Sequence, residues 1–211
     1  MEIVLVPIGV LVSGRGSNLE AILDAVDGKY ITKGEVRVVV SNKPGVGALE
    51  IAKKNGVPTA VLDDKGLPKM DPEYDAKTMA TLEAQGVNSR DGLVALAGYF
   101  RILGSEFVEK YKNRIMNVHP ALLPSFPGLE PQKRALEHGV KVSGATVHFA
   151  AKDVDSGPII LQAHVPVRDD DTVDTLSERI LRQEHRIYPE AIRLFTEGRL
   201  KVEGRRVTLA T

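Results

Sequence analysis

The sequence predicts an α/β fold, with an open, mainly parallel, twisted sheet that carries helices on both faces. The first observation is residues 8–12, a continuous apolar run of the kind found in strands buried on both faces. A glycine-rich turn over residues 13–18 follows, and then apolar residues at helical spacing, Leu19, Ile22, Leu23 and Val26. Strand-like and helix-like segments also alternate along the chain, which favours βαβ units and parallel strands.

The remaining elements are predicted from the same patterns. Further strands are expected over residues 35–41, 58–62, 93–97, 114–119, 142–149 and 159–167. Helices are expected over residues 47–55, 72–86, 105–112, 129–138 and 172–188, with Asp71 as an N-cap. Pro189 predicts the end of the last of these helices and a separate turn through Phe195. Residues 200–209 predict a hairpin around Glu203-Gly204, and no linker or repeat divides the chain, so we expect one domain over residues 1–211.

Composition excludes several classes of function. The chain of 211 residues is 43% hydrophobic and 27% charged, which is ordinary globular composition and excludes disorder and collagen-like structure. Lys+Arg and Asp+Glu both number 28, so the chain lacks the basic excess that nucleic-acid binding requires. Without cysteine, disulfides, thiolate catalysis and Cys-type zinc sites are excluded. The longest apolar run is too short to span a bilayer, and no signal peptide precedes it, so we expect a cytoplasmic protein.

The turn after the first strand predicts an anion site. Free backbone N–H groups at a helix N-terminus bind phosphate, and Gly16, Ser17 and Asn18 are the expected contacts. A third glycine is absent, so the dinucleotide fingerprint fails, and no Walker motif follows. Ser17 with Glu20 also fits a capping box, a structural role that is compatible with phosphate binding at the same helix end.

A second candidate site lies at the end of the strand over residues 114–119. Alternation puts Asn117 and His119 on one face with Val118 in the core, and Pro120 ends the strand after His119. Open α/β sheets bind ligands at this edge, although a histidine in an apolar strand is often only structural. We interpret His148, which alternation turns toward the same region, as a hydrogen-bonded wall residue. Residues 98–104, which follow another strand, suit a flat, partly apolar ligand or else cover the core.

Asp155 completes a group with acyl-transfer chemistry. His119 supplies a base near neutral pH, Asp155 orients it and is expected to raise its pKa, and Asn117 provides an amide to hold an oxyanion. No Gly-x-Ser-x-Gly elbow and no cysteine are present, so neither a serine nor a cysteine triad is supported. The substrate itself must then bring the nucleophile.

Six ordered segments resemble the phosphoribosylglycinamide formyltransferase family, the folate-dependent formyltransferases of purine synthesis. They extend over almost the whole chain: residues 13–18 (SGRGSN), 96–103 (LAGYFRIL), 117–124 (NVHPALLP), 144–149 (GATVHF), 155–162 (DSGPIILQ) and 183–189 (QEHRIYP). The resemblance implies that the amino group of glycinamide ribonucleotide attacks the formyl carbon of 10-formyltetrahydrofolate, which serves as formyl donor, with no metal. It also implies a formyltransferase fold with a Rossmann-like N-terminal half.

Carried over by position, the resemblance implies a full set of site residues. The catalytic trio is Asn117, His119 and Asp155. The ribonucleotide contacts are Gly16, Ser17, Asn18, Leu181, Arg182, Gln183 and Glu184. The folate contacts are Phe100, Arg101, Ile102, Leu103, Asn117, Ala151, Lys152, Asp153, Val154 and Asp155. Residues 8–110 would form a phosphosugar-binding half and residues 111–211 a catalytic and folate-binding half.

Some positions depart from the family pattern. An arginine expected ahead of the helix that begins near Asp71 has no clear match, and Lys69 is the candidate for its place in the folate site. Residues 1–7 precede the usual first strand and are expected as a frayed extension, and residues 87–92 form a longer loop. Glu130 stands where many relatives carry histidine.

Three alternatives remain open from the sequence. A formyltetrahydrofolate hydrolase or a methionyl-tRNA formyltransferase would share this core but carry an extra domain. A non-catalytic phosphosugar- or cofactor-binding module is the more distant alternative. We expect small-molecule substrates, no nucleic-acid or membrane partner, and a monomer or homodimer.

Overall fold

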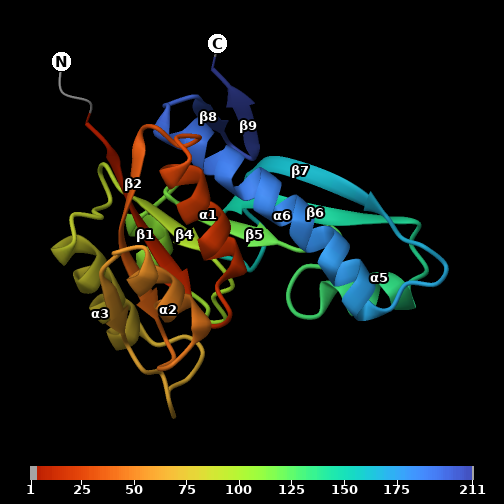
Figure 1. The fold of residues 1–211 in the computed structure, drawn as a ribbon, viewed down its shortest axis with the longest axis horizontal. Helices are drawn as coiled ribbons and strands as arrows, with labels where there is room; N and C mark the ends of the chain where they lie inside the picture. Colours follow the sequence, from red (N-terminus) through yellow and green to blue (C-terminus); the bar gives the residue numbers. More distant parts are fainter. Residues whose placement is uncertain (1–3, 211) are drawn as a thin grey trace.

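The computed structural model describes residues 4–210, in which the strands form one twisted sheet (Figure 1). Its order is β3-β2-β1-β4-β5-β6-β7-β9-β8. The strands are β1 (Val6–Val12), β2 (Gly34–Ser41), β3 (Thr59–Val61), β4 (Leu93–Leu96), β5 (Ile115–His119), β6 (Val142–Phe149), β7 (Ile159–Pro166), β8 (Leu200–Glu203) and β9 (Arg206–Leu209). The helices are α1 (Ser17–Asp27), α2 (Gly47–Lys54), α3 (Pro72–Ala84), α4 (Ser105–Lys110), α5 (Pro131–Glu137) and α6 (Val173–Thr196).

β6 runs opposite to its two neighbours in the part of the sheet that carries the candidate residues. The first five strands in spatial order, β3 to β5, are parallel, which confirms the predicted mainly parallel core. β6 then pairs antiparallel with β5, and β7 antiparallel with β6. The carboxyl end of β5 therefore lies beside a hairpin rather than beside another parallel strand.

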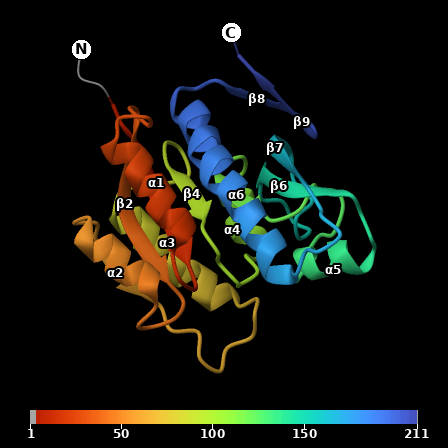
Figure 2. The same cartoon turned by 45° about the vertical axis from the view of Figure 1, so that its right-hand side comes forward.

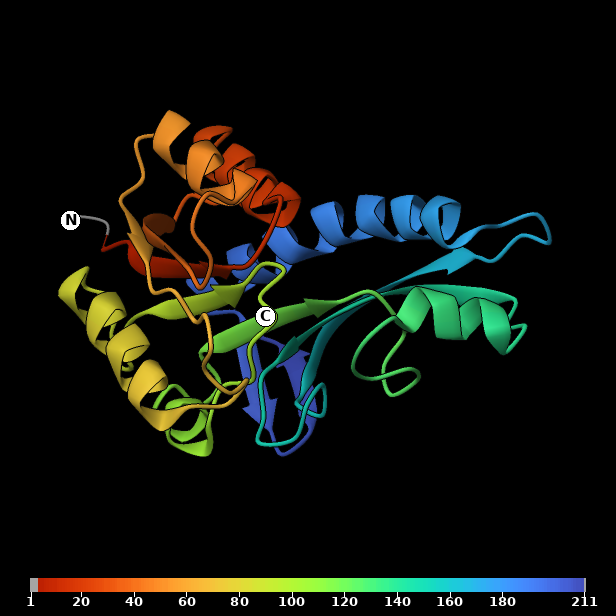
Figure 3. The same ribbon diagram turned by 90° about the horizontal axis from the view of Figure 1, so that it is seen from below.

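Helices cover both faces of the sheet, as predicted. Figure 3 shows α1, α2 and α6 above the sheet and α3 and α4 below it. β1 illustrates why two cores result: Ile8, Val10 and Val12 pack with α1 and α6, whereas Leu11 packs on the other face with α3 and α4 residues. This alternation follows from the two-residue repeat of a strand and leaves β1 buried on both faces.

The long helix α6 corrects one prediction. It runs unbroken through 24 residues with Pro189 inside it, rather than ending near Tyr188 (Figure 2). Proline removes one helical hydrogen bond, but the residues around it form a buried face along the sheet, Glu184, Ile187, Tyr188, Ala191 and Ile192. Burial of this face offsets the local cost, which the local proline rule could not anticipate.

Smaller corrections concern where elements begin. Val6 and Pro7 belong to β1 and pair with β2, so the predicted frayed extension is too long; residues 1–3 lie outside the described residues. The capping box predicted for Ser17 and Glu20 is wrong, because α1 is capped by Gly16 without a side-chain hydrogen bond. α5 begins at Pro131, two residues later than predicted, after Glu130 with a φ of 51°. Asp71 caps α3 as expected, accepting a hydrogen bond from the Tyr74 N–H.

Across residues 4–210, the structure contains no helix with the length and apolarity needed to cross a membrane.

Candidate active site

The end of β5 positions the central pair of candidate residues. Val118 turns into the core, while Asn117 and His119 point to the opposite face of the strand, as alternation predicts. The antiparallel register places His148 of β6 opposite Asn117 and Thr146 opposite His119. Two histidines from neighbouring strands therefore lie at the same edge of the sheet.

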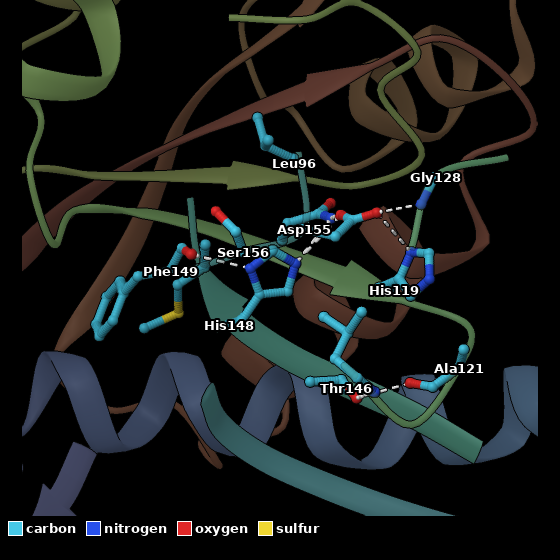
Figure 4. A network of polar contacts seen from close by, with 12 residues as sticks. Leu96, His119, Ala121, Gly128, Thr146, His148, Phe149, Asp155 and Ser156 are labelled. Atoms are coloured by element: carbon cyan, nitrogen blue, oxygen red, sulfur yellow. Dashed lines mark hydrogen bonds and ion pairs between the residues drawn. The ribbon is translucent and has the colours of Figure 1, made fainter. Parts of the chain in front are cut away.

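The loop between β6 and β7 brings Asp155 to this pair. Its Oδ2 lies 3.2 Å from His119 Nδ1 and accepts a hydrogen bond from the Gly128 N–H at 2.8 Å (Figure 4). Its Oδ1 lies 3.4 Å from Asn117 Nδ2, so the three predicted catalytic residues do meet. Asp155 has a φ of 53°, and the chain then crosses the β6 backbone at Gly157, where a Cβ would come within 1.8 Å of the Phe149 carbonyl oxygen. A side chain at residue 157 would therefore displace the turn that presents Asp155.

Burial decides the protonation tendencies of this group. Desolvation lowers the pKa of His119 below its ordinary value, and the opposing effects of Asp155 and of the Phe126 carbonyl do not overcome it. The expectation that Asp155 raises this pKa is confirmed, but desolvation has the larger effect. Burial also raises the pKa of Asp155, but hydrogen bonds from His148 and Gly128 outweigh it, so the Asp155 pKa lies below its ordinary value. A neutral imidazole beside an ionised carboxylate is the resulting state near neutral pH.

Both ring nitrogens of His119 have partners. Nε2 lies 2.8 Å from the Phe126 carbonyl oxygen, on the side of the ring opposite Asp155. Two acceptors are both satisfied only when both nitrogens carry protons, a form that burial opposes. The imidazole is thus held between geometry that favours its charged form and an environment that favours its neutral form, which suits a group that gains and loses a proton.

His148 is a buried wall residue, as interpreted from the sequence. Its Nδ1 lies 2.9 Å from the Phe149 carbonyl oxygen, which requires a proton on Nδ1. Its Nε2 lies 3.3 Å from Asn117 Nδ2 and 3.5 Å from Asp155 Oδ1. His148 therefore lies beside both Asn117 and Asp155.

The predicted ribonucleotide loop is held by a close backbone approach. Gly16 has a φ of 92°, and a Cβ there would lie 2.6 Å from the Ala48 Cα in α2. The first turn of α1 consequently presents free backbone N–H groups at the same sheet edge as His119. Only glycine fits this position without moving α2.

Asn18 connects this loop to α6. Its Nδ2 donates to Glu184 Oε2 at 2.8 Å, which brings together two residues that the sequence separates widely. Glu184 is buried, and desolvation raises its pKa even though Asn18 counteracts the effect. Leu181 and Gln183 are half-buried and Arg182 is exposed, so these three stay predictions as ribonucleotide contacts.

The predicted folate wall divides into exposed and buried parts. Phe100 is 63% exposed, whereas the Leu103 side chain is buried. The Ile102 N–H donates to the Lys69 carbonyl, so Lys69 contacts this segment through its backbone, while its side chain is exposed. Arg101 lies buried in an ion pair with Asp64 and is not directed to solvent. Lys152, Asp153 and Val154 are exposed in the loop before Asp155, and Ala151 is half-buried.

Within residues 4–210, no cluster of three or more histidine, aspartate or glutamate side chains has the arrangement to hold a metal ion.

Comparison with known proteins identifies the family of this chain. A family profile described as "Formyl transferase" matches residues 6–192. The chain is 43% identical to the phosphoribosylglycinamide formyltransferase of Escherichia coli (strain K12) over 193 residues, covering 92% of this chain and 88% of the relative. The chain belongs to the formyl transferase family. Relatives named phosphoribosylglycinamide formyltransferase match the chain over most of their own length.

Solved formyl transferases extend the match to the fold. The crystal structure of glycinamide ribonucleotide transformylase 1 from Symbiobacterium toebii has a TM-score of 0.91 at 51% identity, covering 98% of this chain and 95% of that chain. The human trifunctional purine biosynthetic protein adenosine-3 is 44% identical over 195 residues, but the chain spans only 19% of its length. A formyltetrahydrofolate deformylase from Pseudomonas syringae, at 22% identity and a TM-score of 0.86, shares the fold.

Sequence reasoning missed two backbone groups in the candidate site. The Phe126 carbonyl contacts His119 and the Gly128 N–H contacts Asp155, but neither residue is among the predicted site residues. The two prolines and the glycine in residues 122–128 did signal an unusual backbone path, and Phe126 and Gly128 both have positive φ. Backbone contacts of this kind carry no residue-type signal, so the sequence offered no direct way to find them.

Proposed function

We propose that this chain transfers the formyl group of 10-formyltetrahydrofolate to the amino group of glycinamide ribonucleotide in purine biosynthesis. The observation that carries the proposal is the meeting of Asn117, His119 and Asp155 at the carboxyl end of β5, on the sheet edge that also carries the Gly16–Asn18 loop after β1 and residues 100–103 after β4. A base, an amide donor and an ionised carboxylate meet there without a protein nucleophile. The amine of the ribonucleotide fills that missing role.

The proposed reaction begins when the amine nitrogen attacks the formyl carbon. The carbonyl π electrons move to oxygen, and Asn117 Nδ2, with His119 once it is protonated, stabilises the oxyanion. His119 Nε2 accepts the proton that the attacking nitrogen loses, so Nε2 must exchange the Phe126 carbonyl for the substrate. Asp155 stabilises the imidazolium that results.

The second half of the proposed reaction returns the proton. His119 protonates N10 of the folate as the bond between N10 and the formyl carbon breaks, and the oxyanion collapses to the amide carbonyl. Formylglycinamide ribonucleotide and tetrahydrofolate leave, with His119 neutral again. No electron acceptor is needed, because the formyl carbon keeps its oxidation state.

The flanks supply substrate positioning in this proposal. Gly16, Ser17 and Asn18 bind the phosphate at the α1 N-terminus, and Glu184, with Leu181, Arg182 and Gln183 beside it, contacts the sugar end. Residues 100–103 and 151–155 enclose the folate, with Lys69 at the edge of that pocket. Residues 8–110 and 111–211 would thus contribute a phosphosugar half and a catalytic half, although each flank also draws on the other half. We further propose a cytoplasmic monomer or homodimer without nucleic-acid or membrane partners.

One assay separates this function from its nearest alternative. Purified protein is given 10-formyltetrahydrofolate with and without glycinamide ribonucleotide, and release of tetrahydrofolate is measured. We expect turnover only when the ribonucleotide is present, with one formylated product per folate released. Equal folate turnover without the ribonucleotide would instead identify a formyltetrahydrofolate hydrolase, since water would then be the acceptor.

A further inference from the structure

A chain of polar side chains, buried except for the partly exposed Asp64, links segments that follow neighbouring strands at the sheet edge of the site. It consists of Ser13 after β1, Asn42 after β2, Asp64 in the β3–α3 loop and Arg101 after β4, and we call it the polar relay. Ser13 Oγ lies 2.5 Å from Asn42 Oδ1, and Asn42 Nδ2 lies 2.8 Å from Asp64 Oδ2. Arg101 Nη1 lies 2.9 Å from the same Asp64 oxygen. The relay therefore joins the segments that follow four neighbouring strands, along the edge that carries the candidate site.

The groups at the two ends of the relay determine which side chains donate and which accept hydrogen bonds along it. The Phe100 N–H, which must donate, points to Ser13 Oγ at 2.9 Å, so the serine hydroxyl is free to donate onward to Asn42 Oδ1. Asp64 is an ionised acceptor, so the Asn42 amide must donate to it through Nδ2. Each side chain thus has one orientation that satisfies all its neighbours, and an acid or an alkyl group in place of the Asn42 amide breaks the sequence of donors.

Burial makes the relay costly to disturb. Asn42 is 1% exposed and the Arg101 side chain 2% exposed, so water cannot replace a lost partner. Desolvation raises the pKa of Asp64, but the hydrogen bonds from Asn42 and Arg101 outweigh it and hold that pKa below its ordinary value. Arg101 also lies 3.9 Å from the centre of the Tyr74 ring and donates through Nη2 to the Pro68 carbonyl. The Arg101 guanidinium therefore joins two points of the β3–α3 loop, Asp64 and Pro68, to the predicted folate wall.

These contacts hold residues 100–102 at several points. Ser13 takes the Phe100 N–H, the Arg101 side chain is anchored by Asp64, and the Ile102 N–H donates to Lys69. Ser13 lies directly before the Gly14–Asn18 segment, so the same hydroxyl borders the ribonucleotide loop. We propose that Ser13, Asn42 and Asp64 are positioning residues that set the formyl-donor wall, residues 100–103, against the ribonucleotide loop. This inference rests on the proposed function and assigns Arg101 to holding the wall, not to contacting the donor.

The central test is an isosteric charge exchange. Asn42→Asp puts two carboxylates side by side and removes the donor to Asp64, so the wall should shift while the fold keeps its shape. We expect the Michaelis constant for 10-formyltetrahydrofolate to rise about tenfold, with kcat at saturation and the pH profile nearly unchanged. Adding Asp64→Asn restores one carboxylate and one amide, and the double variant should recover most of the loss. Asn55→Asp, the same change on an exposed helix end, is the matched control and should change nothing.

A second variant covers the case in which Asn42→Asp does not fold. Ser13→Ala buries no charge and only removes the link from Asn42 to the Phe100 N–H, and it should raise the same Michaelis constant by a few-fold. An unchanged constant in both variants, or a double variant no better than Asn42→Asp, would overturn the proposal. A fall in kcat and melting temperature together with a rise in both Michaelis constants would also overturn it, because that pattern marks a structural role only.

Failure of the proposed function is distinguishable from failure of the relay. If the unaltered protein does not formylate the ribonucleotide, the proposed function is wrong whatever the variants do. Calorimetry with tetrahydrofolate alone measures the affinity of residues 100–103 for the folate without turnover. Tetrahydrofolate affinities that follow the same order as the Michaelis constants, with rescue in the double variant, would support the relay. Equal affinities in all variants would refute it.

Discussion

His119 lies between opposing influences, and that conflict defines its role. Asp155 and the Phe126 carbonyl favour the protonated ring, while burial favours the neutral one and determines the net direction. Replacement of His119 by alanine should lower kcat for formyl transfer by about a hundredfold or more, because proton transfer from the attacking amine loses its acceptor. Ribonucleotide affinity, measured by equilibrium titration, should stay nearly unchanged, since Gly16–Asn18 and Glu184 lie elsewhere. Full activity in this variant would contradict the mechanism.

The pH dependence of kcat should show the direction in which the pKa of His119 is shifted. In the proposed mechanism the neutral ring is the base, so kcat should rise with pH through a pKa below about 6.5 and stay level above it. Asp155→Asn removes the charge that raises this pKa, so the rising limb should move to lower pH while the plateau falls. The profile is measured at saturating substrates. A limb that moves to higher pH in Asp155→Asn would show that the carboxylate does not favour the imidazolium.

Adding a side chain at Gly16 tests whether residues 16–18 bind the ribonucleotide. Gly16→Val meets both a strained φ of 92° and the Ala48 backbone, so α1 must shift and the Michaelis constant for the ribonucleotide should rise about tenfold or more. Gly86→Ala, at φ 80° with open space around the new Cβ, is the matched control for backbone strain alone. It should cost about 1 kcal/mol of stability without altering kinetics. An unchanged ribonucleotide constant in Gly16→Val would refute the loop assignment.

The residues that sequence alone placed correctly are those governed by local rules. Alternation within one strand put Asn117 and His119 on the same face, and the structure confirms it. The ion pair between Arg101 and Asp64 had no such signal, because the partners come from different strand ends and a buried guanidinium looks like any other arginine in a sequence. The contact of Asp155 with His119 was inferred from chemistry, and the β5–β6–β7 register supplies it physically.

Among the elements, α6 continues through its internal proline because contacts with distant strands stabilise it. The Tyr188 hydroxyl lies 2.9 Å from the Met116 carbonyl oxygen and 3.1 Å from that of Leu96, fastening the helix to β5 and β4. Tyr188 is fully buried, so no water replaces a lost hydroxyl. The rule that proline ends a helix is local, whereas this anchoring comes from strands far away in the sequence, which is why the predicted break near Tyr188 was wrong.

A pair of identical substitutions measures this anchoring. Tyr188→Phe should lower the free energy of unfolding by about 1 to 3 kcal/mol, because two carbonyl groups lose a buried donor. Tyr30→Phe removes a hydroxyl that contacts Glu190 at the surface, 160 positions away, and should change stability by less than about 0.5 kcal/mol. Urea unfolding followed by circular dichroism gives both values. Equal losses in the two variants would mean that the Tyr188 hydroxyl does not anchor α6.

For the whole molecule, the two halves expected from the sequence share one sheet. β4 of the first half pairs with β5 of the second, and α6 packs on α1 across the boundary. The candidate site crosses it as well, through Asn18 and Glu184. Sequence patterns predicted the order of elements well, because each buried strand carries its own apolar signal. They could not predict how closely the halves depend on each other, because pairing between strands leaves no mark in either strand alone.

This shared sheet predicts that the halves do not fold independently. Separating residues 4–110 from residues 111–210 would expose the paired edges of β4 and β5 and the buried face of α6, more apolar surface than either fragment could compensate. Calorimetry of the whole chain should therefore give one transition whose calorimetric and van't Hoff enthalpies agree. Each fragment alone should lack cooperative unfolding by circular dichroism, and mixing the two should restore it. Two resolved transitions in the whole chain, or a fragment with a cooperative transition of its own, would show two independent domains.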